Sequence, residues 1–168
     1  MIRVLVFSEV EIGQSVVEVV ASSFRGLVEV RAERVDLTPL KAQALDASRM
    51  QIRADRLLEL LGPTGAGRQR RVYVVDADGY VPGLNFVFGA AYGDKAVVFT
   101  KRLDPSSPLF DIRLAKEIIH ELGHTLGLGH CRNPRCIMYF SNTIIDTDLK
   151  GPGFCDKCFE KLRRSVEI

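Results

Sequence analysis

The fold is decided by one stretch, His120-Glu121-Leu122-Gly123-His124-Thr125-Leu126-Gly127-Leu128-Gly129-His130, which contains all three histidines of the 168-residue chain. The sequence around it has helical character, so we expect a helix from Leu109 to about Leu126. Residues four apart lie on one face of a helix, with Cβ atoms about 5–6 Å apart. The rings of His120 and His124 can therefore reach one metal ion at about 2.0–2.1 Å.

A third ligand has to approach from another direction if the site is tetrahedral. Gly127 has no Cβ to penalise a positive φ, so the chain can turn there and bring His130 back toward the ion. Three neutral imidazoles with one open corner are typical of a catalytic zinc site. Glu121 projects about 100° around the helix from His120. The sequence thus predicts Glu121 as the general base that activates a zinc-bound water.

All four cysteines lie between residues 131 and 158, spaced Cys-x4-Cys and then Cys-x2-Cys: Cys131, Cys136, Cys155 and Cys158. Together they can bind a second, structural zinc ion as four thiolates. Disulfides, an iron–sulfur cluster and a thiol redox pair are the alternatives. A tail of about 40 residues cannot build much core, so such a metal would supply folding energy. Because Cys131 adjoins His130, the second ion would also fix the third histidine.

The rest of the chain predicts a mixed α/β fold. Apolar residues at helical spacing indicate a helix over 12–24 and a long helix from Leu40 to Leu61, ended by Gly62-Pro63. Residues 62–68 lack the Lys and Ser/Thr of a phosphate-binding loop, so we expect a plain loop. Tyr92-Gly93-Asp94-Lys95 is typical of a hairpin turn. Five strands are expected, over residues 2–8, 28–33, 71–75, 84–91 and 96–100.

Composition narrows the class of protein. Charged residues make up 26% and apolar residues 46% of the chain, which is ordinary for one globular domain over 1–168. No apolar run is long enough for a membrane span, and the first strand is too short for a signal peptide, so we expect a cytoplasmic protein. The net charge is only +2, and the basic groups 68–71 and 161–164 are short. We therefore expect no nucleic-acid partner, and we also expect no membrane partner and a monomer.

The motif resembles that of the metzincin clan of zinc peptidases, His-Glu-x-x-His-x-x-Gly-x-x-His followed by a methionine-containing turn. The match is full over 120–130, and Met138 is the methionine downstream. In some clan members a tyrosine two residues after the methionine also reaches the metal. Phe140 occupies that position here, so no such ligand is expected and Tyr139 is assigned to packing. The cysteine pattern with Met138 is similar to that of the archaemetzincin family.

This resemblance covers about the last 50 residues by specific motifs and the first 110 by element order alone. It implies a zinc peptidase with two zinc ions, one catalytic and one structural. It also implies a twisted, mostly parallel five-stranded sheet with a backing helix and an active-site helix, over 1–127. A small zinc-ribbon-like subdomain with the methionine turn and the four cysteines would follow over 128–168. In the clan an edge strand pairs with substrate, and the 84–91 run is our candidate.

Three functions are compatible with this site. The first is hydrolysis of peptide bonds in a peptide or protein substrate. The second is a catalytically silent zinc-binding module that holds peptides or nucleic acid. The third is a zinc-dependent nuclease of the kind that matures ribosomal RNA, whose motif is similar but has arginine in place of glutamate. Glu121 favours the first, because a purely structural site does not need a carboxylate there.

Overall fold

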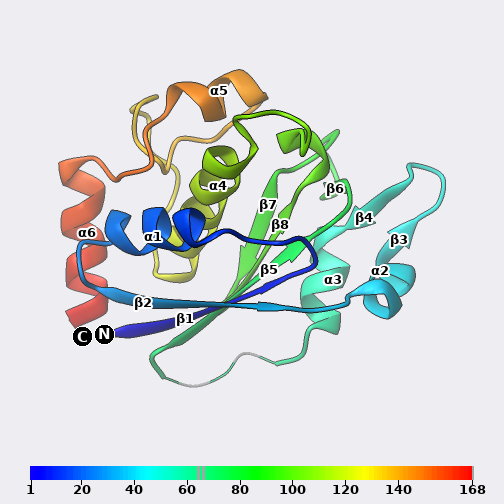
Figure 1. Cartoon of the computed structure of the whole chain (residues 1–168), viewed down its shortest axis with the longest axis horizontal. Helices are drawn as coiled ribbons and strands as arrows, with labels where there is room; N and C mark the ends of the chain where they lie inside the picture. Colours follow the sequence, from blue (N-terminus) through cyan, green and yellow to red (C-terminus); the bar gives the residue numbers. More distant parts are fainter. Residues whose placement is uncertain (64, 66, 168) are drawn as a thin grey trace.

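The computed structural model describes residues 1–63, 65 and 67–167. Its centre is a five-stranded sheet with the strand order β2-β1-β5-β8-β7 (Figure 1). Neighbouring strands are parallel except for the antiparallel pair β7–β8. The predicted mostly parallel sheet is thus confirmed. Its strands are β1 (Ile2–Ser8), β2 (Val28–Arg34), β5 (Gln69–Val75), β7 (Gly89–Tyr92) and β8 (Lys95–Phe99).

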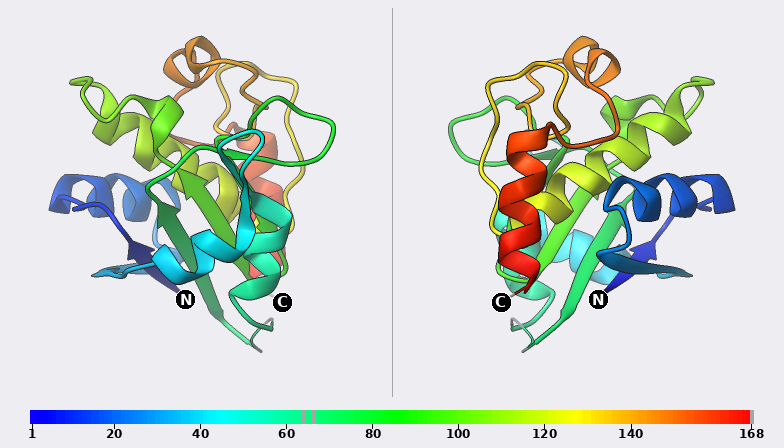
Figure 2. Two further views of the ribbon diagram at one scale, coloured as in Figure 1. Left: turned by 90° about the vertical axis from the view of Figure 1, so that its right-hand side faces the viewer. Right: turned by 90° about the vertical axis from the view of Figure 1, so that its left-hand side faces the viewer.

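Helices cover both faces of this sheet (Figure 2). Side chains alternate along a strand, so β5 contributes to two cores. Val72 and Val74 pack in the core beneath α1 and α4, whereas Tyr73 and Val75 pack in the core beneath α2 and α3. The apolar end of β5, from Val72 to Val75, is thus buried on both faces of the sheet. The four helices are α1 (Gln14–Ser23), α2 (Thr38–Ala44), α3 (Ala54–Leu60) and α4 (Phe110–Thr125).

The last 40 residues wrap around the α4 side of the molecule. After the short helix η1 (Lys101–Leu103) and α4 come α5 (Ile144–Leu149) and α6 (Asp156–Glu167). Leu162 is buried in the core beneath α1 and α4, and the Phe154 ring meets the Phe24 ring edge-on at 5.1 Å. At the end of α6, the carbonyl of Val166 accepts a hydrogen bond from Arg68, just before β5, so α6 packs at that end of the sheet (Figure 1). Among the helices that the structure describes, none has the length and apolar character needed to cross a membrane.

The long helix predicted from Leu40 to Leu61 is wrong. The chain instead forms α2, a small hairpin of β3 (Leu45–Asp46) and β4 (Gln51–Arg53), and then α3. Asp46 Oδ1 accepts hydrogen bonds from the Ser48 amide and hydroxyl, and Met50 has a left-handed φ of 53°. Such local side-chain bonds compete with a helix. The loop predicted over 62–68 includes Thr64 and Ala66, which lie outside the described residues.

The strand predicted over 84–91 is wrong over its first half, because β7 begins at Gly89. The carbonyls of Leu84 and Asn85 accept hydrogen bonds from the side chain of Arg49 rather than from a strand. Before them, β6 (Gly79–Tyr80) joins β3 and β4 in a second, small sheet that the sequence pattern did not indicate. The predicted hairpin turn is present, with Gly93 at φ 62°.

Candidate metal centre and active site

Helix α4 ends as its sequence predicts. Gly127 has a φ of 95°, and its amide donates to the carbonyl of His124 at 3.0 Å. The Leu128 amide donates to the carbonyl of Gly123 at 2.9 Å, which completes a Schellman cap. Leu128 is buried, so the reversed chain is held against the core. The turn at Gly127 thereby brings His130 back to the two helical histidines.

The three histidine rings converge. Ring centroids lie 4.7 Å apart for His120 and His124, 4.8 Å for His124 and His130, and 5.4 Å for His120 and His130. One ring nitrogen from each residue lies within 4.8 Å of the others, so the group could hold a metal ion. His120 is buried, whereas His130 is exposed. The cluster is therefore anchored in the core and open on one side.

The protonation of these rings fits a metal ion. His120 Nδ1 lies 2.7 Å from the carbonyl oxygen of Ile137, and His124 Nδ1 lies 2.8 Å from that of Leu128. A carbonyl only accepts, so both Nδ1 atoms carry the proton and both Nε2 atoms present lone pairs. These Nε2 atoms face each other at 3.1 Å. Two ligands of a tetrahedral zinc stand at about 3.3–3.4 Å, so a shared cation would relieve the repulsion.

Burial keeps the rings neutral. It lowers the pKa of His120 well below its ordinary value, and the charge of Lys150 lowers that pKa further. Burial is also the main cause of the lowered pKa of His124 and of His130. Neutral imidazole is the form that binds a metal, because the protonated ring has no lone pair.

Glu121 lies beside the histidines without a partner of its own. It is buried, and no described donor lies within hydrogen-bonding distance of its Oε2 atom. Burial raises the pKa of Glu121 well above its ordinary value, and the charge of Glu117 raises it further. Gly89 of β7 packs against this side chain: a Cβ there would meet Glu121 Oε1 at 2.9 Å and the Val97 carbonyl oxygen at 2.6 Å. The edge strand and the carboxylate are therefore adjacent.

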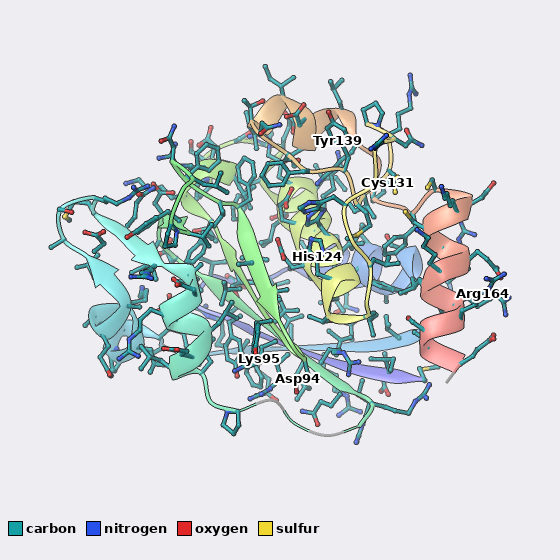
Figure 3. The ribbon with its side chains drawn as sticks, turned by 180° about the vertical axis from the view of Figure 1, so that it is seen from behind. Asp94, Lys95, His124, Cys131, Tyr139 and Arg164 are labelled. Carbon is teal, nitrogen blue, oxygen red and sulfur yellow. The ribbon has the colours of Figure 1, made fainter. Side chains whose placement is uncertain are left out.

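The turn that contains Met138 forms the floor of the site. Met138 is fully buried, and a Cβ on Gly123 would meet its Sδ atom at 2.5 Å. The carbonyl of the preceding residue, Ile137, is the one that accepts from His120. The Phe140 ring lies 5.0 Å from the His130 ring, so it contacts the third histidine. Figure 3 shows His124 on α4, with Tyr139 and Cys131 on the neighbouring tail.

A buried charged network ties α4 to the tail behind His120. Lys150 is 1% exposed, and its amine lies 3.4 Å from Glu117 Oε1 on α4. The same amine donates to the carbonyl of Tyr139 at 3.1 Å. Thr147 of α5 donates to Glu117 Oε1 at 3.0 Å. The methionine turn is thereby fixed to the helix that carries the first two histidines.

The four cysteines form a second cluster beside the first. Their sulfurs all lie within 4.8 Å of one another and could hold a metal ion, and all four are free thiols. The sulfurs of Cys131 and Cys155 are 3.9 Å apart, far beyond a disulfide bond of about 2.05 Å. Two ligands of a tetrahedral zinc–thiolate site stand about 3.8 Å apart. The amide of Cys155 donates to the sulfur of Cys136 at 3.3 Å.

Every candidate residue from the sequence lies in one of these two clusters or in their supports. The sequence did not predict the supporting roles of four residues: Gly89, Gly123, Lys150, and Phe140 in its contact with His130. Gly123 could have been found, because a glycine inside a helix is costly and usually has a packing reason. Lys150 gave no such signal, since a single lysine in a polar tail normally indicates solvated surface.

Comparison with known proteins agrees with this geometry. The sequence model of Peptidase family M54 matches residues 15–164. An archaemetzincin of Pyrobaculum aerophilum is 55% identical over 122 residues, which cover 71% of this chain and 76% of the relative. The crystal structure of an archaemetzincin of Methanopyrus kandleri is similar with a TM-score of 0.85 at 36% identity, covering 99% of this chain and 96% of that chain.

A zinc-dependent peptidase of Methanocorpusculum labreanum has a similar structure, with a TM-score of 0.81 at 28% identity, over 96% of this chain and 100% of that chain. The family model spans far more than half of the chain. The fold, the three convergent imidazoles and these relatives therefore lead to one assignment. The chain belongs to Peptidase family M54, the family of the archaemetzincins, and is a zinc metallopeptidase.

Proposed function

We propose that the chain hydrolyses peptide bonds at the histidine cluster, where His120, His124 and His130 hold a catalytic zinc ion and Glu121 is the general base. Zinc bound there would polarise the scissile carbonyl and acidify the attacking water. The observation that carries the proposal is the pair of facing Nε2 lone pairs beside a buried carboxylate oxygen without a partner. Both features are costly unless a cation and a reacting molecule satisfy them.

Glu121 performs the proton transfers in this mechanism. Its unpartnered Oε2 takes a proton from the attacking water and later delivers that proton to the leaving amine. Burial raises the pKa of the carboxyl group, which makes the carboxylate a stronger base. His120 and His124 are held by carbonyl groups and do not move protons.

The cysteine cluster is proposed to hold a second, structural zinc ion. The four sulfurs lie within 4.8 Å of one another, and a zinc ion bound by all four would have no corner left for a substrate. Cys131 follows His130 directly, and its amide donates to the carbonyl of Met138 at 2.9 Å. We therefore propose that residues 128–168 act as a small subdomain whose metal fixes both the third histidine and the methionine turn.

The substrate is proposed to pair with the open edge of β7. The Phe99 amide donates to the carbonyl of Phe88. In an antiparallel pair, residues that bond to the neighbouring strand alternate with residues that do not. Phe88 bonds to β8, so Ala90 does as well, and the amide and carbonyl groups of Gly89 and Ala91 point away from β8. Gly89 lies against Glu121, so a substrate strand paired there passes the general base.

The role of Glu121 is tested by Glu121→Gln, with zinc content and cleavage of a peptide pool both measured. We expect two zinc ions per chain to remain and hydrolysis to fall by at least about 10²–10⁴-fold, the usual contribution of a general base. Glu18→Gln on α1 is the matched control and should cleave as the wild type does. Retained turnover would exclude Glu121 as the base, and a lost zinc ion would make it a ligand instead.

Substrate pairing is tested by two proline variants of β7. Ala91→Pro removes an amide that points outward, so the β7–β8 ladder keeps its bonds. Ala90→Pro removes a ladder bond and serves as the structural comparison. We expect Ala91→Pro to stay folded and to lose about five- to thirteenfold in kcat/KM on peptides, in line with one hydrogen bond of about 1–1.5 kcal/mol. Unchanged kcat/KM in folded Ala91→Pro would exclude pairing at this position.

A further inference from the structure

A cavity of about 660 Å³ opens between α3 and β7, on the face of the sheet opposite α4. This volume lies within the range of about 300–1,000 Å³ that is typical of ligand pockets. None of the histidines or cysteines lines it. The cavity is thus separate from both metal clusters, although it shares β7 with the catalytic one.

The first three residues of β7, Gly89 to Ala91, are small and leave space on the side of the cavity that the strand forms. Ala90 points toward α3, as its place in the core beneath α2 and α3 shows, while Ala91 packs toward α4. Beyond Ala90, the walls come from Leu58 of α3, Pro63 and Val81. A larger side chain at position 90 would occupy this space from the strand itself. The small side chain of Ala90 therefore leaves open the space between β7 and α3.

The charged groups around the cavity are already paired. Lys95 is buried, and its amine donates to the carbonyls of Leu58 and Gly62 at the end of α3, so its stem lines the cavity. At the rim, Asp55 lies 2.9 Å from Arg53 and Glu59 lies 3.0 Å from Arg56. The lysine amine is thus turned away into hydrogen bonds with the backbone, and both carboxylates are paired at the rim, so the walls favour an apolar occupant.

The edge of β7 that faces away from β8 lies next to the cavity and is open to a further strand. The Val87 amide donates to the carbonyl of Gly79 at 2.9 Å, so the position of the next strand is occupied there. From Gly89 to Tyr92, no described strand pairs with this edge. A peptide strand added there would lie about 4.8 Å from β7, with every second side chain on the α3 face. That side chain would enter the cavity beside Ala90.

We propose that this cavity is a specificity subsite for a bulky apolar side chain of the substrate, such as Phe, Leu or Met. The inference rests on the proposed function, because the peptide that supplies this side chain is the one cleaved beside Glu121. Ala90 directly follows Gly89, which contacts Glu121. With a rise of about 3.4 Å per residue, the selected position lies within about three residues of the cleaved bond.

The test uses a pool of randomised octapeptides, digested by the zinc-loaded enzyme, with cleavage sites read by mass spectrometry. We expect Phe, Leu and Met to be enriched about tenfold or more over Ala and Gly at one position within three residues of the cut, the usual discrimination of an apolar pocket. Ala90→Phe fills the cavity and should abolish the enrichment at that position. Ala90→Val is a milder change that suits a strand and should reduce it.

The matched control is Ala32→Phe, on the opposite edge strand β2, which should keep the wild-type enrichment. A preference for Lys or Arg at that position, no apolar preference, or an enrichment that persists in Ala90→Phe and Ala90→Val would each overturn the subsite. If the wild type cleaves no peptide, the proposed function fails. The subsite is then judged by which octapeptides zinc-loaded Glu121→Gln retains, because retention without apolar selection overturns it as well.

Discussion

The histidine cluster and the cysteine cluster lie side by side but are built differently. Two histidines project from one regular helix, and backbone carbonyls fix their tautomers. The cysteines come from the tail turns and the start of α6. Burial lowers the pKa of His120, so its lone pair exists before any metal binds, whereas burial raises the pKa of the Cys136 and Cys158 thiols. The histidine cluster is organised by the fold, whereas the thiols of the cysteine cluster would have to lose protons to bind a metal.

This contrast predicts that removing a ligand has different consequences in the two clusters. Cys155→Ala should remove the proposed structural zinc and destabilise the protein by about 4 kcal/mol or more, because loss of a structural metal is among the largest single-site effects. His124→Ala is the comparison and should lose one zinc ion with a smaller loss of stability. Metal analysis together with denaturant unfolding measures both. If Cys155→Ala unfolds at the wild-type denaturant concentration, the cysteine cluster has no folding role.

The buried ion pair that ties α4 to the methionine turn is tested by Lys150→Met. Removing this amine leaves the buried carboxylate of Glu117 without its ion pair, which costs about 3–5 kcal/mol. Asp148→Asn changes the pair with Arg113, whose carboxylate is 32% exposed, and should cost less than Lys150→Met, because the asparagine amide oxygen still accepts a hydrogen bond from the guanidinium. The double variant Lys150→Met with Glu117→Gln should recover part of the loss. Equal effects of Lys150→Met and Asp148→Asn, measured by urea unfolding, would contradict the structural role of the buried pair.

The elements with the clearest sequence patterns were predicted most accurately. The helix expected from Leu109 to about Leu126 is α4, because its apolar period, its length and the glycine at its end all agree. The helix expected from Leu40 to Leu61 failed although its apolar spacing was also helical. There the bonds of Asp46 to Ser48 and the left-handed Met50 turn the chain, and periodicity does not record such bonds.

In the histidine site, too, features set by local sequence were predictable and contacts between distant elements were not. His120 and His124 are related by helix geometry, and Gly127 indicates the turn that returns His130, so local rules predict that the three rings converge. The contact of Gly89 with Glu121 could not be predicted in this way, because the two residues lie on different elements. Their approach depends on how α4 packs against the sheet, which a single sequence does not specify.

The smallest expected effect concerns the floor of the histidine cluster. Gly123→Ala gains about 1 kcal/mol of helix propensity but places a methyl group 2.5 Å from the Met138 sulfur. Overpacking costs about 1–3 kcal/mol, and Met138 is fully buried, so we expect a net loss of at most about 2 kcal/mol. The displaced turn also carries the Ile137 carbonyl that orients His120, so zinc affinity should fall about tenfold or more.

Gly26→Ala separates this effect from general strain. Gly26 has a φ of 89°, and nothing lies within 4 Å of the position of its missing Cβ. A left-handed alanine costs about 1–2 kcal/mol, so the two variants should lose similar stability. Zinc affinity, measured by competition with a chelator, should fall in Gly123→Ala alone. An equal fall in both variants would show that zinc binding follows overall stability, and then the histidine cluster would depend on folding as much as the cysteine cluster does.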